Sequence, residues 1–172
     1  MRTTTLLIIF ISFFAGYSQE VSKNIQIISE DDVPFEILEI QEDLYPFNLV
    51  SEWQLHRENR NIDSAPLRYI GTIAKDGNSK SSASYSPEGM LLFKSEIILP
   101  VTIPQDINLD IKKKHPKFKI QSAELITLTF PRKEIYWINL LNEGMLQYVF
   151  YDASSKEIQK KDLPMELLIL FR

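Results

Sequence analysis

The sequence predicts an α+β protein built from two tandem copies of a unit with one helix and a four-stranded antiparallel sheet, the helices packed on one sheet face. Two observations support this prediction. Proline pairs enclose two short amphipathic stretches, Pro34 to Pro46 and Pro104 to Pro116. Four strand-like segments separated by turn residues follow each stretch. We therefore expect residues 33–99 and 103–163 to be structural copies. Their two sheets can join edge to edge, which would remove one exposed edge from each.

The N-terminal residues 1–18 have the pattern of a secretory signal peptide. Arg2 precedes an apolar run from Leu6 to Ala15, and the small residues Gly16 and Ser18 follow it. The run is much shorter than the roughly 20 apolar residues that cross a bilayer. The sequence therefore predicts a periplasmic or secreted protein with no membrane span after signal removal.

The first predicted unit, residues 19–100, begins with a helix. Acidic residues and Pro34 suit a helix start, because they meet the positive end of the helix dipole and need no backbone donor. Ile37, Ile40 and Leu44 recur at helical spacing, and Pro46 ends the pattern. Alternating segments then predict four strands, at residues 47–55, 66–74, 81–86 and 90–99.

The second predicted unit, residues 101–172, follows the same order. Ile103, Ile107 and Ile111 form the apolar stripe of its helix, and Pro116 ends it. Lysines at positions 112–114 suit the negative end of the helix dipole, which favours a solvated helix end over a binding patch. Four further strands are predicted at residues 118–130, 134–141, 145–151 and 157–163.

Together these features resemble the PepSY-like proteins of the beta-lactamase-inhibitor-like class, over nearly the whole mature chain. The resemblance rests on the signal peptide, the proline-bounded helices, Trp53 in "SEWQL", the stretch "YSPEGMLLF" and the second helix-and-sheet segment. The chain departs from the pattern at Ala123, which stands where the first unit has Trp53, and at "DASSK", which lacks the usual glycine. The resemblance implies a secreted protein of Gram-negative bacteria with helices on one face of a long sheet. It implies no activity, since inhibition belongs to particular members.

Composition excludes several kinds of chemistry. The formal net charge of −4 leaves no basic surplus for nucleic acid, and the absence of cysteine excludes disulfides and thiolate chemistry. The two histidines, His56 and His115, are too few for a zinc site. The acidic run from Glu30 to Asp43 lacks the ligand spacing of a calcium loop. We therefore expect a non-enzyme with no catalytic residue, metal or cofactor.

Aromatic residues on the predicted strands are the remaining functional signal. Neighbouring residues of a strand point to opposite sheet faces, so some of these rings leave the helix-covered face. Large amphipathic rings on an open sheet face suit protein recognition, although ordinary core packing is the better explanation for any single ring. As candidate contacts for an unknown envelope or secreted protein, the sequence indicates Trp53, Tyr69, Tyr85 and Trp137.

Two classes of function stay open on the sequence alone. The preferred one is a non-enzymatic secreted or periplasmic binding module that recognises a protein with its open sheet face, and inhibition is one form of such recognition. The alternative is a carrier or sensor of a small apolar ligand in the cell envelope, which requires a closed pocket between helices and sheet. A secreted hydrolase is a distant third.

Overall fold

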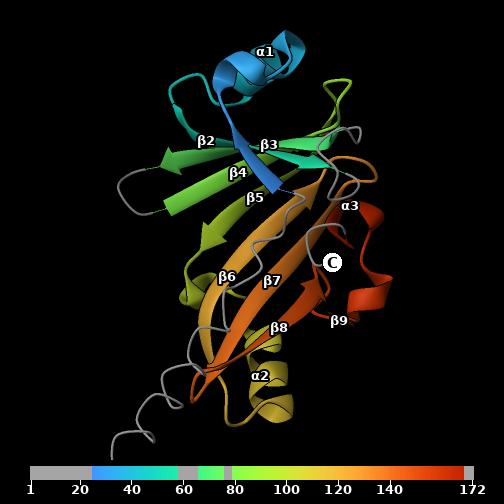
Figure 1. Ribbon diagram of the computed structural model, residues 1–172. Coiled ribbons are helices and arrows are strands. Elements are labelled where there is room, and N and C mark those ends of the chain that lie inside the picture. Colours follow the sequence, from blue (N-terminus) through green and yellow to red (C-terminus); the bar gives the residue numbers. More distant parts are fainter. Residues whose placement is uncertain (1–24, 58–65, 76–78, 169–172) are drawn as a thin grey trace, which may run out of the picture.

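The computed structural model describes residues 25–57, 66–75 and 79–168 (Figure 1). The predicted signal peptide lies outside the described residues. Within them, nine strands form one antiparallel sheet in which every strand pairs with the next along the chain. The strands are β1 (Ile25–Ile28), β2 (Val50–Arg57), β3 (Pro66–Lys75), β4 (Ser79–Tyr85), β5 (Leu91–Ile98), β6 (Lys119–Leu128), β7 (Lys133–Asn142), β8 (Met145–Asp152) and β9 (Glu157–Ile158).

Three short α-helices accompany the sheet in the described part of the chain. They are α1 (Phe35–Leu44), α2 (Gln105–Lys114) and α3 (Met165–Leu168). A single 3₁₀ turn precedes each of them: η1 (Glu30–Asp32), η2 (Pro100–Thr102) and η3 (Lys160–Asp162). None of the described helices is long and apolar enough to cross a membrane.

The proline-bounded helices are confirmed close to their predicted limits. Pro34 and Pro104 are the N-cap residues of α1 and α2, and Tyr45 and His115 are the C-cap residues before the closing prolines. A proline at the start costs a helix little, because its missing N–H would have no partner inside the helix. A proline after the C-cap prevents the helix from continuing.

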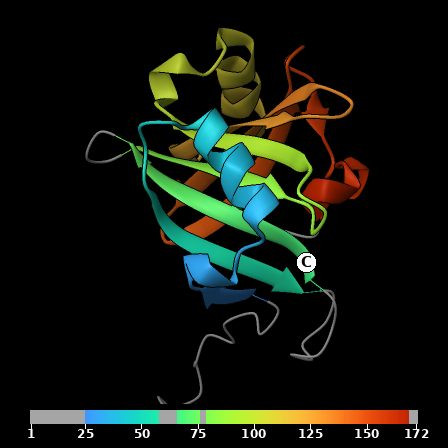
Figure 2. The same ribbon diagram turned by 90° about the horizontal axis from the view of Figure 1, so that it is seen from above.

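The first two helices cover the same face of the sheet, and α3 covers the other. Ile37 of α1 packs on Trp53 and Tyr85, and the isoleucine stripe of α2 packs on strands β6 to β8. Leu167 of α3 packs instead on Ile126 and the other residues of its cluster. Along the strands these residues alternate with those beneath α2, so they point to the opposite face. Seen from above, α1 lies across the strands that form its cluster, and α3, drawn in red, lies apart from it (Figure 2). We call these the α1/α2 face and the α3 face.

The predicted architecture of two tandem helix-and-four-strand units is wrong. The structure is dominated by a single nine-stranded sheet, because β5 pairs with β6 from Phe93↔Leu128 to Ile98↔Ala123. Pairing these strands removes two edges whose backbone groups would otherwise need partners. The expectation that helices cover only one face is also wrong, because α3 packs on the opposite face.

Candidate functional site

Three of the four predicted contact residues lie in the core beneath α1. Trp53 is 3% exposed, Tyr69 8% and Tyr85 0%, and all three belong to the cluster that packs against Ile37. The rings of Trp53 and Tyr85 lie 6.3 Å apart between centroids. Their expected exposure is not found, because strand alternation directs them to the helix-covered face.

Trp137 has a different environment on the α3 face. It is half-buried, and its ring centroid lies 6.0 Å from that of Tyr148 and 6.5 Å from that of Phe150. Tyr148 is half-exposed beside it, whereas Phe150 is buried. Trp137 is therefore the member of the predicted set that lies near the protein surface.

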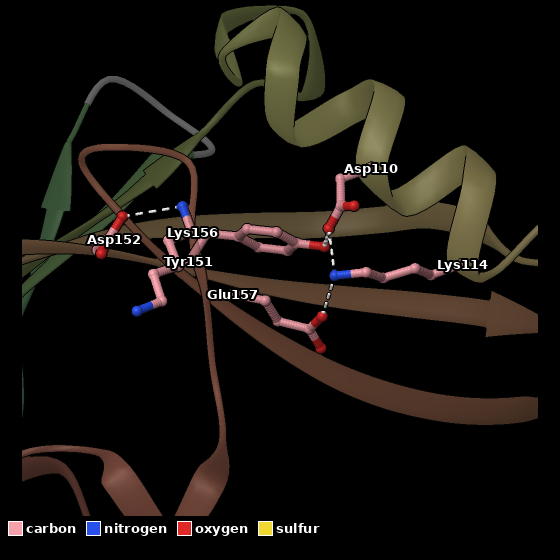
Figure 3. Close-up of polar contacts among 6 residues, drawn as sticks. All are labelled: Asp110, Lys114, Tyr151, Asp152, Lys156 and Glu157. Carbon is pink, nitrogen blue, oxygen red and sulfur yellow. Dashed lines mark hydrogen bonds and ion pairs between the residues drawn. The ribbon is translucent and has the colours of Figure 1, made fainter.

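A polar cluster joins α2 to the last strands (Figure 3). The Tyr151 hydroxyl donates to Asp110 Oδ2 at 2.9 Å. Lys114 Nζ lies 2.7 Å from the same oxygen and 2.6 Å from Glu157 Oε2. One carboxylate thus receives donors from its own helix and from strand β8.

The electrostatics of this cluster suit structure rather than catalysis. The Lys114 hydrogen bond holds the pKa of Asp110 below its usual value, and the Tyr151 bond adds to the effect. Bonds to Asp110 and Glu157 raise the pKa of Lys114. A carboxylate with a lowered pKa is a weak base, and an ammonium with a raised pKa is a poor nucleophile. We therefore interpret the cluster as the attachment of α2 to β8 and β9.

An open pocket lies on the α3 face between the end of the β6–β7 hairpin and the C-terminal segment. Its volume is about 840 Å³. Strands β6, β7 and β9 supply one wall, and η3 and α3 border the other side. It is lined by Leu128, Phe130, Pro131, Arg132, Lys133, Glu134, Ile135, Asp152, Ala153, Ser154, Ile158, Asp162, Pro164 and Glu166.

The pocket combines an apolar floor with a charged rim. Leu128, Ile135 and Ile158 provide aliphatic side chains, and Phe130 is a large apolar group that is 88% exposed at the rim. Around them the lining contains two cations, Arg132 and Lys133, and four carboxylates, Glu134, Asp152, Asp162 and Glu166. This arrangement suits an amphipathic guest whose apolar part is buried while its polar part meets the rim.

Asp152 is the most constrained of the rim carboxylates. Its Oδ1 accepts hydrogen bonds from the backbone N–H of Ser154 and Lys156, each at 2.9 Å, and from the Ser154 hydroxyl at 2.6 Å. The Ser154 side chain is the main reason that the pKa of Asp152 is lowered. Asp152 therefore stays ionised and orders the β8–β9 turn that forms part of the pocket. The Ser154 hydroxyl donates to this carboxylate, and the lowered pKa of Asp152 makes the carboxylate a weak base.

Arg68 holds the far wall of the pocket in place, and sequence reasoning missed it. It is buried on the α3 face, and its Nη1 donates to the backbone oxygen of Glu166 in α3 at 2.5 Å. Its guanidinium lies 5.9 Å from the ring centroid of Phe93. The sequence did contain a signal for Arg68. Neighbouring residues of a strand point to opposite sheet faces, so Arg68 lies on the face opposite to Tyr69 and places a charge on that face of an inner strand.

A short polar row extends from Arg68 along strand β2. His56 lies opposite Arg68 in the sheet, and its Nε2 is 3.3 Å from Gln54 Oε1. Gln54 in turn donates to Glu52 Oε1 at 2.6 Å. Burial, reinforced by the nearby Arg68 charge, lowers the pKa of His56 to about 4. His56 is therefore neutral at physiological pH.

Among the described residues, no group of histidines and carboxylates is arranged to hold a metal ion.

Comparisons with known proteins identify the fold. No family model matches the chain. No curated protein matches it either. A DUF2874 family protein from Bacteroides uniformis has a similar structure, with a TM-score of 0.61 and 10% identity over 74% of this chain and 87% of that chain. A putative periplasmic protein from Bacteroides eggerthii gives a TM-score of 0.62 and 10% identity over 74% of this chain and 86% of that chain. At this identity the likeness shows the fold alone, and the resemblance to PepSY-like proteins stays a prediction.

Proposed function

We propose that this protein is a non-enzymatic periplasmic binding module that recognises a segment of another envelope protein in the pocket on the α3 face. The signal-peptide pattern of residues 1–18 supports an extracytoplasmic location. The structural neighbour from Bacteroides eggerthii, which is named as a putative periplasmic protein, supports the same compartment.

The observation on which the proposal depends is the composition of the pocket. Its aliphatic floor offers a place for an apolar side chain, whereas its rim presents charges of both signs. A segment of a protein partner matches both, because it brings apolar side chains together with a polar backbone and charges. Exposed Phe130 gives such a partner an aromatic contact at the rim.

A small amphipathic ligand is the second candidate, and the pocket volume favours it. About 840 Å³ falls within the roughly 300–1,000 Å³ of ordinary small-molecule sites. A purely apolar ligand fits less well, because six charged residues line the site and keep water near it. A carrier of such a ligand requires a closed apolar pocket, whereas this pocket is open and has a charged rim.

The test uses exposed rim residues, so that loss of binding is separable from loss of folding. The chain from residue 19 onward would be immobilised and incubated with envelope extract, and captured proteins would be quantified by mass spectrometry. Phe130→Ala and Arg132→Glu should each reduce capture of the specific partner at least tenfold. Phe47→Ala, which alters a 97% exposed ring outside the pocket lining, should leave capture unchanged.

Two outcomes would redirect the proposal. Capture that is the same for wild type and both rim variants would remove the pocket from the binding surface. A small molecule released from the purified wild-type protein on denaturation, but absent from the Phe130→Ala preparation, would favour the ligand carrier instead. If a partner is an enzyme, assaying it with wild type and with the rim variants would show whether binding inhibits it.

A further inference from the structure

Strand β8 has a neighbour on only one side over most of its length. On one edge β7 pairs with all of it, from Ile135↔Asp152 to Asn142↔Met145. On the other edge β9 pairs only with Phe150 and Tyr151. Among the described residues, the edge from position 145 to 149 therefore has no strand beside it, and Figure 1 shows β8 near the end of the sheet with only the short β9 beyond it.

The backbone groups that face this open edge follow from strand alternation. The Asp152 N–H donates to Lys156 O, on the β9 side, at 2.9 Å. In an antiparallel ladder, every second residue directs its N–H and C=O to the same side. Leu146 and Tyr148 therefore direct both backbone groups to the open edge. Such unpaired groups are a template for an added strand.

The open edge also lacks the features that normally prevent strand addition. Natural edge strands are protected by lysines, prolines or bulges, whereas positions 145–149 read "MLQYV" and contain no charge and no proline. Met145 is 63% exposed, Leu146 45% and Tyr148 49%. Tyr148 adjoins Trp137 on the α3 face, so an added strand would also cover apolar surface.

The charges at the two ends of this edge are of opposite sign, so they complement those of a second copy of β8 that runs antiparallel to the first. Glu143 is exposed in the turn before β8. At the other end, the chain leaves the edge after Ile158 and continues into exposed Lys160 and Lys161. An antiparallel second copy of β8 brings its Glu143 to the end of the edge where the chain continues into these lysines, and the two-fold symmetry repeats this arrangement.

We propose that two copies of the protein associate through β8, antiparallel and edge to edge, about a two-fold axis at Gln147. In this register Leu146 lies opposite Tyr148 of the second copy, so both residues with open backbone groups are paired. Met145 then lies opposite Val149, the last position before β9 occupies the edge at Phe150. An isologous contact of this kind closes as a dimer. It joins two sheets into one and is independent of the proposed pocket function.

The absence of cysteine makes the register directly testable. In Gln147→Cys, the introduced thiol faces its own copy across the axis, in a pair whose Cβ atoms lie about 4.5–5.5 Å apart, close enough to form a disulfide after small adjustments. Mild oxidation should link most of the protein as a covalent dimer. Met145→Cys is the matched control, because the register separates the two thiols by four residues, roughly 13 Å, and should give little dimer.

Sedimentation of the unmodified protein supplies a second measurement. Wild type should show a concentration-dependent monomer–dimer equilibrium. Leu146→Lys combined with Tyr148→Lys should weaken it at least tenfold, whereas Phe47→Lys in the turn after α1 should not. Glu143→Lys should weaken the dimer several-fold, and Lys160→Glu with Lys161→Glu should restore it in the same chain.

Three results would overturn the proposal. The first is a wild-type protein that stays monomeric at millimolar concentration while Gln147→Cys forms no disulfide. The second is equal cross-linking of Gln147→Cys and Met145→Cys, which indicates random collision. The third is a ladder of higher oligomers, which indicates head-to-tail pairing of β8 with the other edge strand, β1.

Discussion

Arg68 donates a hydrogen bond from its guanidinium to the backbone oxygen of Glu166, 98 positions further along the chain. The bond joins an inner strand to a helix of only four residues. So short a helix has no stability of its own, since isolated helices below about 12–15 residues are marginal in water. The position of α3, and with it one wall of the pocket, therefore depends on contacts such as this one.

Arg68→Ala should lower the free energy of unfolding by about 2–4 kcal/mol. The substitution leaves a cavity beside Phe93 and removes the donor from the Glu166 carbonyl, and both losses destabilise a buried site. Urea unfolding followed by circular dichroism measures the change. Arg132→Ala is the control, because Arg132 is exposed and should change stability by less than about 0.5 kcal/mol. Equal midpoints for the two variants would show that Arg68 does not anchor α3.

His56 should make the protein less stable in mild acid. Its pKa is lowered to about 4 by burial and by the Arg68 charge, whereas an imidazole in an unfolded chain titrates near 6.5. Between these values the unfolded chain binds a proton that the folded protein does not. The stability contributed by neutral His56 is therefore complete above about pH 6.5 and is lost as the pH falls toward 4, by roughly 2 kcal/mol.

The measurement compares unfolding free energies of wild type and His56→Gln between pH 4 and 7.5. All other ionisable groups are common to the two proteins and largely cancel in the difference. The stability of wild type should fall relative to that of the variant as the pH is lowered. A difference that does not change with pH would contradict the assigned environment of His56.

Two tyrosine hydroxyls provide a matched pair of hydrogen bonds between the sheet and a helix. Tyr85 donates to Gln41 Oε1 at 2.5 Å in a buried site, and Tyr151 donates to Asp110 Oδ2 at 2.9 Å in a partly buried one. Tyr85→Phe should cost about 2 kcal/mol, because it leaves a buried amide oxygen without its donor. Tyr151→Phe should cost about 1 kcal/mol, because Lys114 still pairs with Asp110. Thermal unfolding of the two variants tests the order, and a larger loss for Tyr151→Phe would reverse the argument.

The parts of the fold that the sequence predicted have strong local signals. Pro34 and Pro104 mark helix starts whatever surrounds them. Ile107 and Ile111 proved to be the buried residues of α2, and Ile103 is buried just before the helix. The option of joining the two predicted sheets edge to edge is realised by the pairing of β5 with β6. The sequence did not show that the result is one sheet rather than two units, because that depends on which edges meet in space. Helix α3 was missed because "MELL" is too short to show helical periodicity.

The candidate site was less predictable than the fold. Alternation predicts that neighbouring rings point to opposite faces, but it does not say which face a helix covers. Trp53, Tyr69 and Tyr85 therefore proved to be core residues, and Trp137 lies on the α3 face. The pocket combines residues of the β6–β7 hairpin with Asp162 and Glu166, and their proximity follows only from the placement of α3.

Gly71→Ala tests how closely the core beneath α1 is packed. A Cβ at this position would lie 3.0 Å from two carbons of the Trp53 ring, and Gly71 is the residue opposite Trp53 in the sheet. The backbone here is an ordinary strand, so the cost is steric and should be about 1–3 kcal/mol. Denaturant unfolding measures it. In a Trp53→Phe background the smaller ring leaves room for the methyl group, so Gly71→Ala should cost at least 1 kcal/mol less there. An equal cost in the two backgrounds would show that another contact, and not the Trp53 ring, excludes a side chain at position 71.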